Sequence, residues 1–202
     1  MVLKLAGSPA RTMMRCPTIL VPQRMCYDRV PDGQRVIEPV TFEMCSVRDS
    51  PLPTYSMRDS INWPEPDMLH PDINDLIAGS GGRQFGIKLF IMWPGYNLHI
   101  EAISLLTPDG KQWLSRAGLH RKIARAYEAF FLSIQNLKTI SNPAKQEWAV
   151  WHSSRHCDLS RLTVVTLRHC GADIFQADVE LTISSVTIVS TADLVQTNSP
   201  HR

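Results

Sequence analysis

The sequence predicts an α+β protein in which a mostly antiparallel sheet packs on one long helix, behind an extended proline-rich N-terminal arm. Three observations support this class. Proline is concentrated in the first third of the chain, several segments alternate apolar and polar residues, and one segment repeats its apolar residues with the period of a helix. Strands and one long helix without a strand–helix–strand rhythm favour antiparallel pairing.

Residues 1–78 are expected to form an extended, partly flexible arm. Ten of the 14 prolines lie in the first 71 residues, and such a density excludes a helix of normal length. Short apolar runs around 18–21 and 36–42 predict strand-like pieces within the arm. Residues 1–36 hold six cations and two carboxylates, a local charge of +4. Glycine and serine then predict a flexible joint at 79–83.

A globular α+β domain is expected over 84–195, with a loose tail at 196–202. Residues 84–93 alternate apolar and polar side chains, a period typical of a half-buried strand. Pro94-Gly95 predicts a turn, and 96–100 alternates again, so a hairpin is expected. Thr107-Pro-Asp-Gly110 predicts a second turn.

The segment 115–137 predicts the long helix. Its apolar side chains recur three or four positions apart and form one stripe, with Ser115 as the N-cap and Asn142-Pro143 as the stop. The stripe consists of Leu119, Ile123, Ala126, Tyr127, Phe130, Ile134 and Leu137. Runs with strand character follow at 148–151, 161–167 and 179–189.

Composition narrows the classes of function. The formal net charge is +2, which is not the balance of a nucleic-acid-binding domain, and no apolar run is long enough to span a bilayer. The first residues do not have the pattern of a secretory signal, so an intracellular protein with peripheral membrane contact is expected. Five cysteines with irregular spacing are expected to be free thiols.

One cluster of imidazoles and thiols suggests a metal site. Zinc prefers such ligands, and the spacing of the first two histidines suits it, whereas the adjacent His-Cys pair does not. The cluster consists of His152, His156, Cys157, His169 and Cys170. A small zinc-stabilised binding module is therefore the alternative function. A cysteine hydrolase is a third class, although no catalytic signature surrounds either thiol; a Gly-x-Ser-x-Gly serine signature is absent as well.

A basic patch surrounds the start of the predicted helix. Its members are Lys111, Arg116, Arg121, Lys122 and Arg125. Cations near a helix N-terminus oppose the helix dipole, so an anionic partner such as lipid headgroups or RNA phosphates would account for them. An ordinary solvated helix face is the other interpretation.

The plan of the chain resembles the matrix proteins of non-segmented negative-strand RNA viruses, and rhabdovirus matrix proteins in particular. The resemblance rests on a basic N-terminal region, a flexible joint, a strand at Phe85–Trp93, the long helix and a closing strand at Ala177–Ser184. It also rests on Pro51, Leu52, Pro53, Thr54 and Tyr55, which stand where the family displays a late-budding peptide.

This resemblance implies a non-enzymatic structural protein without a cofactor or a small-molecule substrate. Such a protein associates with itself, here through the N-terminal arm, lies beneath an anionic membrane, and condenses the viral ribonucleoprotein during assembly and budding. A host budding factor would bind the late-budding peptide. The expected locations are the virion, the host cytoplasm and the inner face of a host membrane, with the nucleus as a further option.

Overall fold

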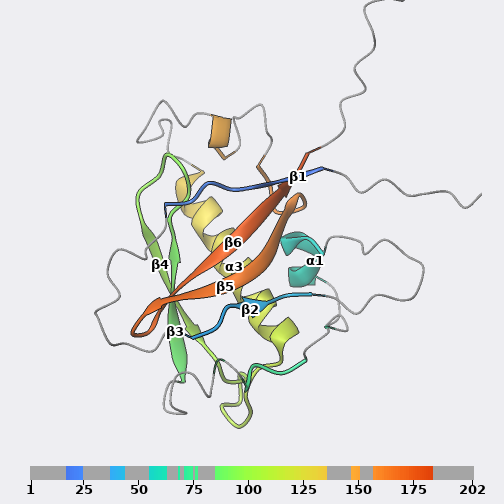
Figure 1. The fold of residues 1–202 in the computed structure, drawn as a ribbon, viewed down its shortest axis with the longest axis vertical. Helices are drawn as coiled ribbons and strands as arrows, with labels where there is room; N and C mark the ends of the chain where they lie inside the picture. Colours follow the sequence, from blue (N-terminus) through green and yellow to red (C-terminus); the bar gives the residue numbers. More distant parts are fainter. Residues whose placement is uncertain are drawn as a thin grey trace, which may run out of the picture.

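The computed structural model describes residues 17–24, 37–43, 55–62, 68, 71–74, 76, 85–135, 147–150 and 157–183. Within these residues the protein is α+β, with a six-stranded mixed sheet and two helices (Figure 1). The strands are β1 (Thr18–Leu20), β2 (Val40–Thr41), β3 (Gly86–Ile91), β4 (His99–Ser104), β5 (Leu162–Gly171) and β6 (Ile174–Thr182). The helices are α1 (Met57–Asn62) and α3 (Arg116–Ile134).

The sheet has the strand order β2-β5-β6-β3-β4, and β1 also pairs with β6. The pairs β3–β4, β5–β6, β2–β5 and β1–β6 are antiparallel, whereas β3 and β6 run parallel. The chain reaches β6 from β3 through β4, α3 and β5, a connection long enough to bring the two strands side by side in the same direction. The sheet is therefore mixed, and the mostly antiparallel sheet predicted from the sequence is corrected by this one parallel pair.

β1 and β3 pair with successive parts of β6. β3 pairs with residues 174–176 of β6, and β1 pairs with residues 180–182. Because β5 pairs along nearly the whole of β6, both shorter strands lie on its other side. The N–H of Val21 extends the second pairing by donating to the carbonyl of Val179 at 2.8 Å. The N-terminal segment 17–21 is thus an integral part of the sheet.

Other described parts of the region 1–78 also belong to the domain. β2 pairs with β5, and α1 packs against α3. Apolar side chains from these segments are buried in the same core as the sheet and α3: Val21, Ile37, Val40, Phe42, Met57, Met68, Ile73 and Leu76. These segments therefore do not form an arm that stands apart from the domain. The predicted joint at 79–83 and tail at 196–202 lie outside the described residues.

The predicted hairpin is confirmed. β3 and β4 pair in register from Gly86 with Ser104 to Ile91 with His99, and Gly95 in the turn has a φ of 90°. The alternation also holds, because the odd-numbered residues of β3 are buried. Phe85 is the exception: it was expected on the buried face, yet it is 60% exposed and its ring stacks on Trp113 at 5.7 Å.

α3 lies against one face of the sheet (Figure 1). Ser115 is its N-cap, as predicted, and its Oγ accepts a hydrogen bond from the N–H of Gly118 at 2.9 Å. Buried aromatic rings of α3 meet Trp93, which is edge-on to Phe131 and to Tyr127. All described members of the predicted apolar stripe are buried.

The C-terminal strands differ in extent from the predicted runs. β5 and β6 are longer than expected at one end, with bulges between Val164 and Thr166 and between His169 and Gly171. The strand predicted at 148–151 is not formed by its described residues 148–150, since Val150 makes only an isolated bridge with Cys157. A side chain holds this segment instead: the indole N–H of Trp93 donates to the backbone carbonyl of Trp148 at 2.8 Å.

Candidate functional site

The five predicted cations fall into two groups. Three of them bond to backbone carbonyls of the protein itself, and two are exposed to solvent. The sequence predicted one patch because these cations crowd the N-terminal end of a helix, where the helix dipole disfavours positive charge. The bonds to carbonyls supply a structural reason for three of them that does not require an anionic partner.

Arg116 is a buried clamp, and its inclusion in a surface patch was wrong. Its side chain is only 3% exposed. Nε donates to the carbonyl of Asp72 at 3.0 Å, and Nη1 donates to the carbonyl of Thr41 at 2.8 Å. Its own N–H donates to the carbonyl of Pro71 at 2.7 Å. A planar guanidinium with several donors can bond to two separate segments at once, as it does here.

Arg121 and Lys122 are half-buried and fix neighbouring elements. Nε of Arg121 donates to the carbonyl of Ser60 at 2.9 Å, close to the C-terminal end of α1, where a cation is favourable. Nζ of Lys122 donates to the carbonyls of Ser104 at 2.9 Å and Leu106 at 3.1 Å. Partial burial lowers the pKa of Lys122. Both cations therefore face solvent only in part.

Lys111 and Arg125 are the exposed members of the patch. Lys111 lies in a loop between β4 and α3 that is held by its own hydrogen bonds. The N–H of Gly110 donates to the carbonyl of Thr107 at 2.8 Å, and the N–H of Thr107 donates to the carbonyl of Gln112 at 2.8 Å. Gly110 has a φ of 70°, which a side chain would disfavour. The loop therefore presents Lys111 in a defined position.

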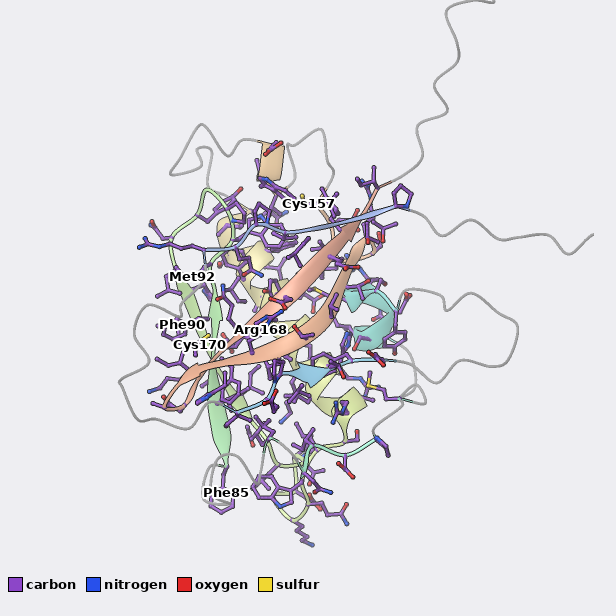
Figure 2. All side chains as sticks on the ribbon, in the orientation of Figure 1. Phe85, Phe90, Met92, Cys157, Arg168 and Cys170 are labelled. Carbon is purple, nitrogen blue, oxygen red and sulfur yellow. The ribbon has the colours of Figure 1, made fainter. Side chains whose placement is uncertain are left out.

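A stacked aromatic pair lies at the base of this loop, with Phe85 exposed and Trp113 partly buried against the core. The rings of Phe85 and Trp113 stack with their planes 13° apart. Leu106 and Trp113 form a β-bridge, and the N–H of Leu105 donates to the carbonyl of Phe85 at 2.8 Å, so the two rings are held on neighbouring strands. Phe85 lies at the end of β3 farthest from Cys157 (Figure 2). This end of the molecule combines a cation with apolar rings.

Tyr55 is the one described residue of the predicted late-budding peptide, because residues 51–54 lie outside the described segments. Its ring lies 5.7 Å from the ring of His120, and its hydroxyl donates to the carbonyl of Asp59 at 3.3 Å. Tyr55 immediately precedes α1 and packs on the domain. Tyr55 is thus partly buried, and the late-budding motif as a whole stays a prediction.

α1 begins with a capping box, and no helix was predicted here from the sequence. The N–H of Asp59 donates to Oγ of Ser56 at 3.1 Å, and the N–H of Ser56 donates back to Oδ2 of Asp59 at 3.3 Å. Ser-x-x-Asp/Glu before a helical turn is a known N-terminal signature. It was present in Ser56-Met-Arg-Asp59 and would have placed a helix in the proline-rich region.

Replacing Ser56 with alanine should lower the free energy of unfolding by about 1 kcal/mol, because the cap of α1 is lost. Equilibrium urea unfolding of the two proteins measures the difference. Ser133→Ala is the matched control: that hydroxyl bonds back to the carbonyl of Phe130 within α3, a contact that stabilises a helix little. Equal stability of Ser56→Ala and wild type would show that the box does not hold α1.

The predicted zinc ligands do not converge. His152 and His156 lie outside the described residues, and the other three stand at opposite ends of β5. Cys157 precedes the strand, whereas His169 and Cys170 lie near its far end, so about 30 Å of strand separates the first from the last. Figure 2 shows the two cysteines well apart. No group of three metal-ligating side chains occurs among the residues that the structure describes.

Each of the three described members has another role. Nδ1 of His169 accepts from the N–H of Ile37 at 3.3 Å while Nε2 donates to the carbonyl of Ala172 at 3.0 Å, so both ring nitrogens are used. Cys157 is buried and forms no disulfide. Cys170 is disulfide-bonded. The expectation that every cysteine is a free thiol was wrong at Cys170.

A buried polar centre joins α1 to α3. His120 and Ser60 are each 1% exposed, and Nδ1 of His120 lies 2.8 Å from Oγ of Ser60. Phe42 packs edge-on against the imidazole at 5.1 Å. Burial lowers the pKa of His120 from 6.5 to about 4, so the ring is neutral at physiological pH. The centre positions α1 and is enclosed, unlike a catalytic dyad that receives a substrate.

The chain was compared with protein-family models, curated proteins and solved structures. None of them matches. One further finding bears on membranes: no described helix is both long and apolar enough to cross one.

Proposed function

We propose that this protein is a non-enzymatic viral matrix protein that binds an anionic membrane peripherally, assembles with itself and condenses a ribonucleoprotein during virion assembly. One observation supports the membrane step in particular. The loop 105–114 carries exposed Lys111 beside the stacked rings of Phe85 and Trp113. Aromatic rings favour the boundary between headgroups and acyl chains, and cations are attracted to anionic lipids.

The membrane surface in this proposal differs from the five-residue patch. It comprises Phe85, Lys111, Trp113 and Arg125, with Lys122 between them. Lys122 bonds to the first carbonyls of the loop, and Arg125 follows it by three positions, so the two lie on the same side of α3. The proposal does not include recruitment of a host factor through Tyr55, because that side chain packs on His120.

Charge reversal at Lys111 should weaken flotation of the full chain with vesicles of phosphatidylcholine and phosphatidylserine. Each cation near an anionic surface contributes about 1 kcal/mol, so Lys111→Glu should reduce partitioning at least about fivefold. Adding Arg125→Glu should reduce it further. Binding to vesicles of phosphatidylcholine alone should be weak for all variants.

Lys88→Glu provides the matched control. Lys88 is also exposed, and its ion pair with Asp173 at 2.9 Å contributes little at such a position, so the substitution changes the net charge equally but elsewhere on the surface. Phe85→Ser tests the aromatic component and should lower binding without a change in net charge. If Lys111→Glu floats as wild type does, or if Lys88→Glu reduces flotation equally, the loop is not the membrane-binding surface.

A further inference from the structure

β4 is an edge strand of the described sheet. It ends the strand order, and no described segment pairs with it beyond β3. Natural edges are protected by lysine, proline, bulges or short length. β4 has six residues, His-Ile-Glu-Ala-Ile-Ser, with neither lysine nor proline, and its register with β3 is regular throughout. Such an edge can accept another strand.

The hydrogen bonds on the inner side of β4 show which backbone groups face outward. The N–H of Leu105 donates to the carbonyl of Phe85, and in an antiparallel pair such bonding positions recur at every second residue. The odd-numbered residues of β4 therefore bond to β3, and the N–H and carbonyl groups of Ile100 and Ala102 point away from it. The hydrogen bonds of Lys122 are consistent with this direction, since its Nζ donates to the carbonyls of the even-numbered residues Ser104 and Leu106.

Lys122 also limits the open part of the edge. Because its ammonium group occupies the carbonyls at 104 and 106, a second strand can add only alongside the residues before Ser104. Apolar side chains are exposed in that window: Leu98 is 46% exposed and Ile100 is 51% exposed. Ile100 lies opposite Phe90 of β3, on the sheet face away from α3.

We propose that β4 pairs with β4 of a second copy of this chain, antiparallel, with the two-fold axis at Ile100. In this register Ile100 faces its own counterpart, and Leu98 faces Ala102 of the second copy. On the other face of the sheet, His99 faces Glu101 of the second copy. An imidazole N–H donates well to a carboxylate whether or not the ring is charged.

Charge and polarity disfavour moving the axis toward the C-terminal end of β4. Moving the axis to Glu101 would place the two carboxylates directly opposite each other, which is unfavourable. Moving it to Ala102 would set Glu101 against Ile103, leaving the carboxylate without a polar partner across the strand. Only the axis at Ile100 pairs apolar with apolar residues on one face and imidazole with carboxylate on the other.

His99 itself supplies a second observation. Its Nε2 is buried and has no hydrogen-bond partner, although Oε2 of Glu101 in the same chain lies 3.4 Å away, within ion-pair distance. The imidazole packs on Phe130 with ring centroids 5.4 Å apart, so its orientation is set by α3. The imidazole is therefore held at this edge, beside the position that Glu101 of the second copy would take.

The strand is short, so the dimer should be weak, like other small interfaces. This specifies the self-association within the proposed function, placing it on β4 and not on the N-terminal region. Its test needs no membrane, so failure of membrane binding and failure of pairing are separate results.

Sedimentation of the full chain across a concentration series tests the pairing. Wild type should show a monomer–dimer equilibrium, and Ile100→Lys should raise its dissociation constant at least about tenfold, because two like charges would then face each other on the axis. Leu132→Lys is the matched control, since Leu132 is 57% exposed on α3 and lies outside the edge, and it should dimerise as wild type does. A wild type that stays monomeric, or an Ile100→Lys variant that dimerises equally well, overturns the proposal.

Cysteine cross-linking tests the register. Ile100→Cys should form a covalent dimer under mild oxidation, because directly opposite residues lie within reach of a disulfide. Ala102→Cys should not, because the two copies of residue 102 would be about four residues apart along the strands, roughly 13 Å. Wild type shows the background from native cysteines. Equal cross-linking at both positions, or cross-linking at 102 alone, contradicts the two-fold axis at Ile100.

Discussion

Replacing Arg116 with alanine should lower the free energy of unfolding by about 3 kcal/mol. The guanidinium is the shared donor for the carbonyls of Asp72 and Thr41, and the side chain is 3% exposed. Its removal leaves two partly buried acceptors without this donor and opens a space between α3 and the segments before it. Equilibrium urea unfolding, followed by far-ultraviolet circular dichroism, gives the difference.

Two further variants make this result specific to the clamp. Arg116→Lys should lose part of the stability, since a single ammonium group cannot take the place of the planar fork between two carbonyls. Lys111→Ala removes an exposed cation from the same predicted patch and should change stability by no more than about 0.5 kcal/mol. A stability of Arg116→Ala close to that of Lys111→Ala would show that the clamp does not hold the N-terminal segments.

The elements with a strong local pattern were predictable from the sequence. The β3–β4 hairpin follows from alternation on both sides of Pro94-Gly95, and Ser115 marks the start of α3 by its capping chemistry. Both signals lie within a few residues of the structure that they specify. The overall class, α+β, depends on the order of such local patterns and was predictable for the same reason.

The pairing of distant segments was not predictable in this way. Nothing local to β3 indicates that it runs parallel to β6, or that β1 shares the same side of β6. The prolines at 17, 22 and 39 flank β1 and β2 and do not interrupt them, so the strand-like pieces expected around 18–21 and 36–42 are confirmed as β1 and β2. Their pairing with β6 and β5 in the main sheet was not predicted. Long-range pairing depends on the surface that the rest of the chain presents.

The candidate site shows the same division. The exposure of Lys111 follows from its place in a polar turn, which the sequence reveals. The burial of Arg116 depends on carbonyls at 41 and 72, far from it in the chain. Charge and spacing alone cannot separate these two cations. Phe85 illustrates the reverse case: the alternation predicted burial, but the residue stands before β3 begins, where the core no longer covers it.

Acidification should destabilise the protein through His120. The folded protein keeps this imidazole neutral until about pH 4, whereas in the unfolded chain it takes up a proton near its ordinary pKa of 6.5. Between these values the unfolded state binds more protons, so stability falls as the pH falls from about 6.5 to 4. The shift corresponds to about 3 kcal/mol in total, all of it present above pH 6.5.

The physical cause is the enclosure of the imidazole. Ser60 and the backbone of Val164 contact it, while the rings of Phe42 and Tyr55 close around it. These neighbours come from α1, from β5 and from the segment that follows β2. A charged ring there would lack solvation, so protonation should release α1 and the 37–43 segment from α3 before the sheet itself opens.

Urea unfolding of wild type and His120→Gln at steps from pH 4 to pH 7.5 measures the effect. Glutamine supplies a donor and an acceptor but cannot titrate, so the difference in unfolding free energy between the two proteins should shrink or reverse as the pH falls. Other histidines and carboxylates titrate in the same range, and comparing the two proteins removes their shared contribution. Parallel pH dependences would mean that His120 is not held neutral by its surroundings. Hydrogen exchange in α1 that rises first on acidification would locate the event at the contact between α1 and α3.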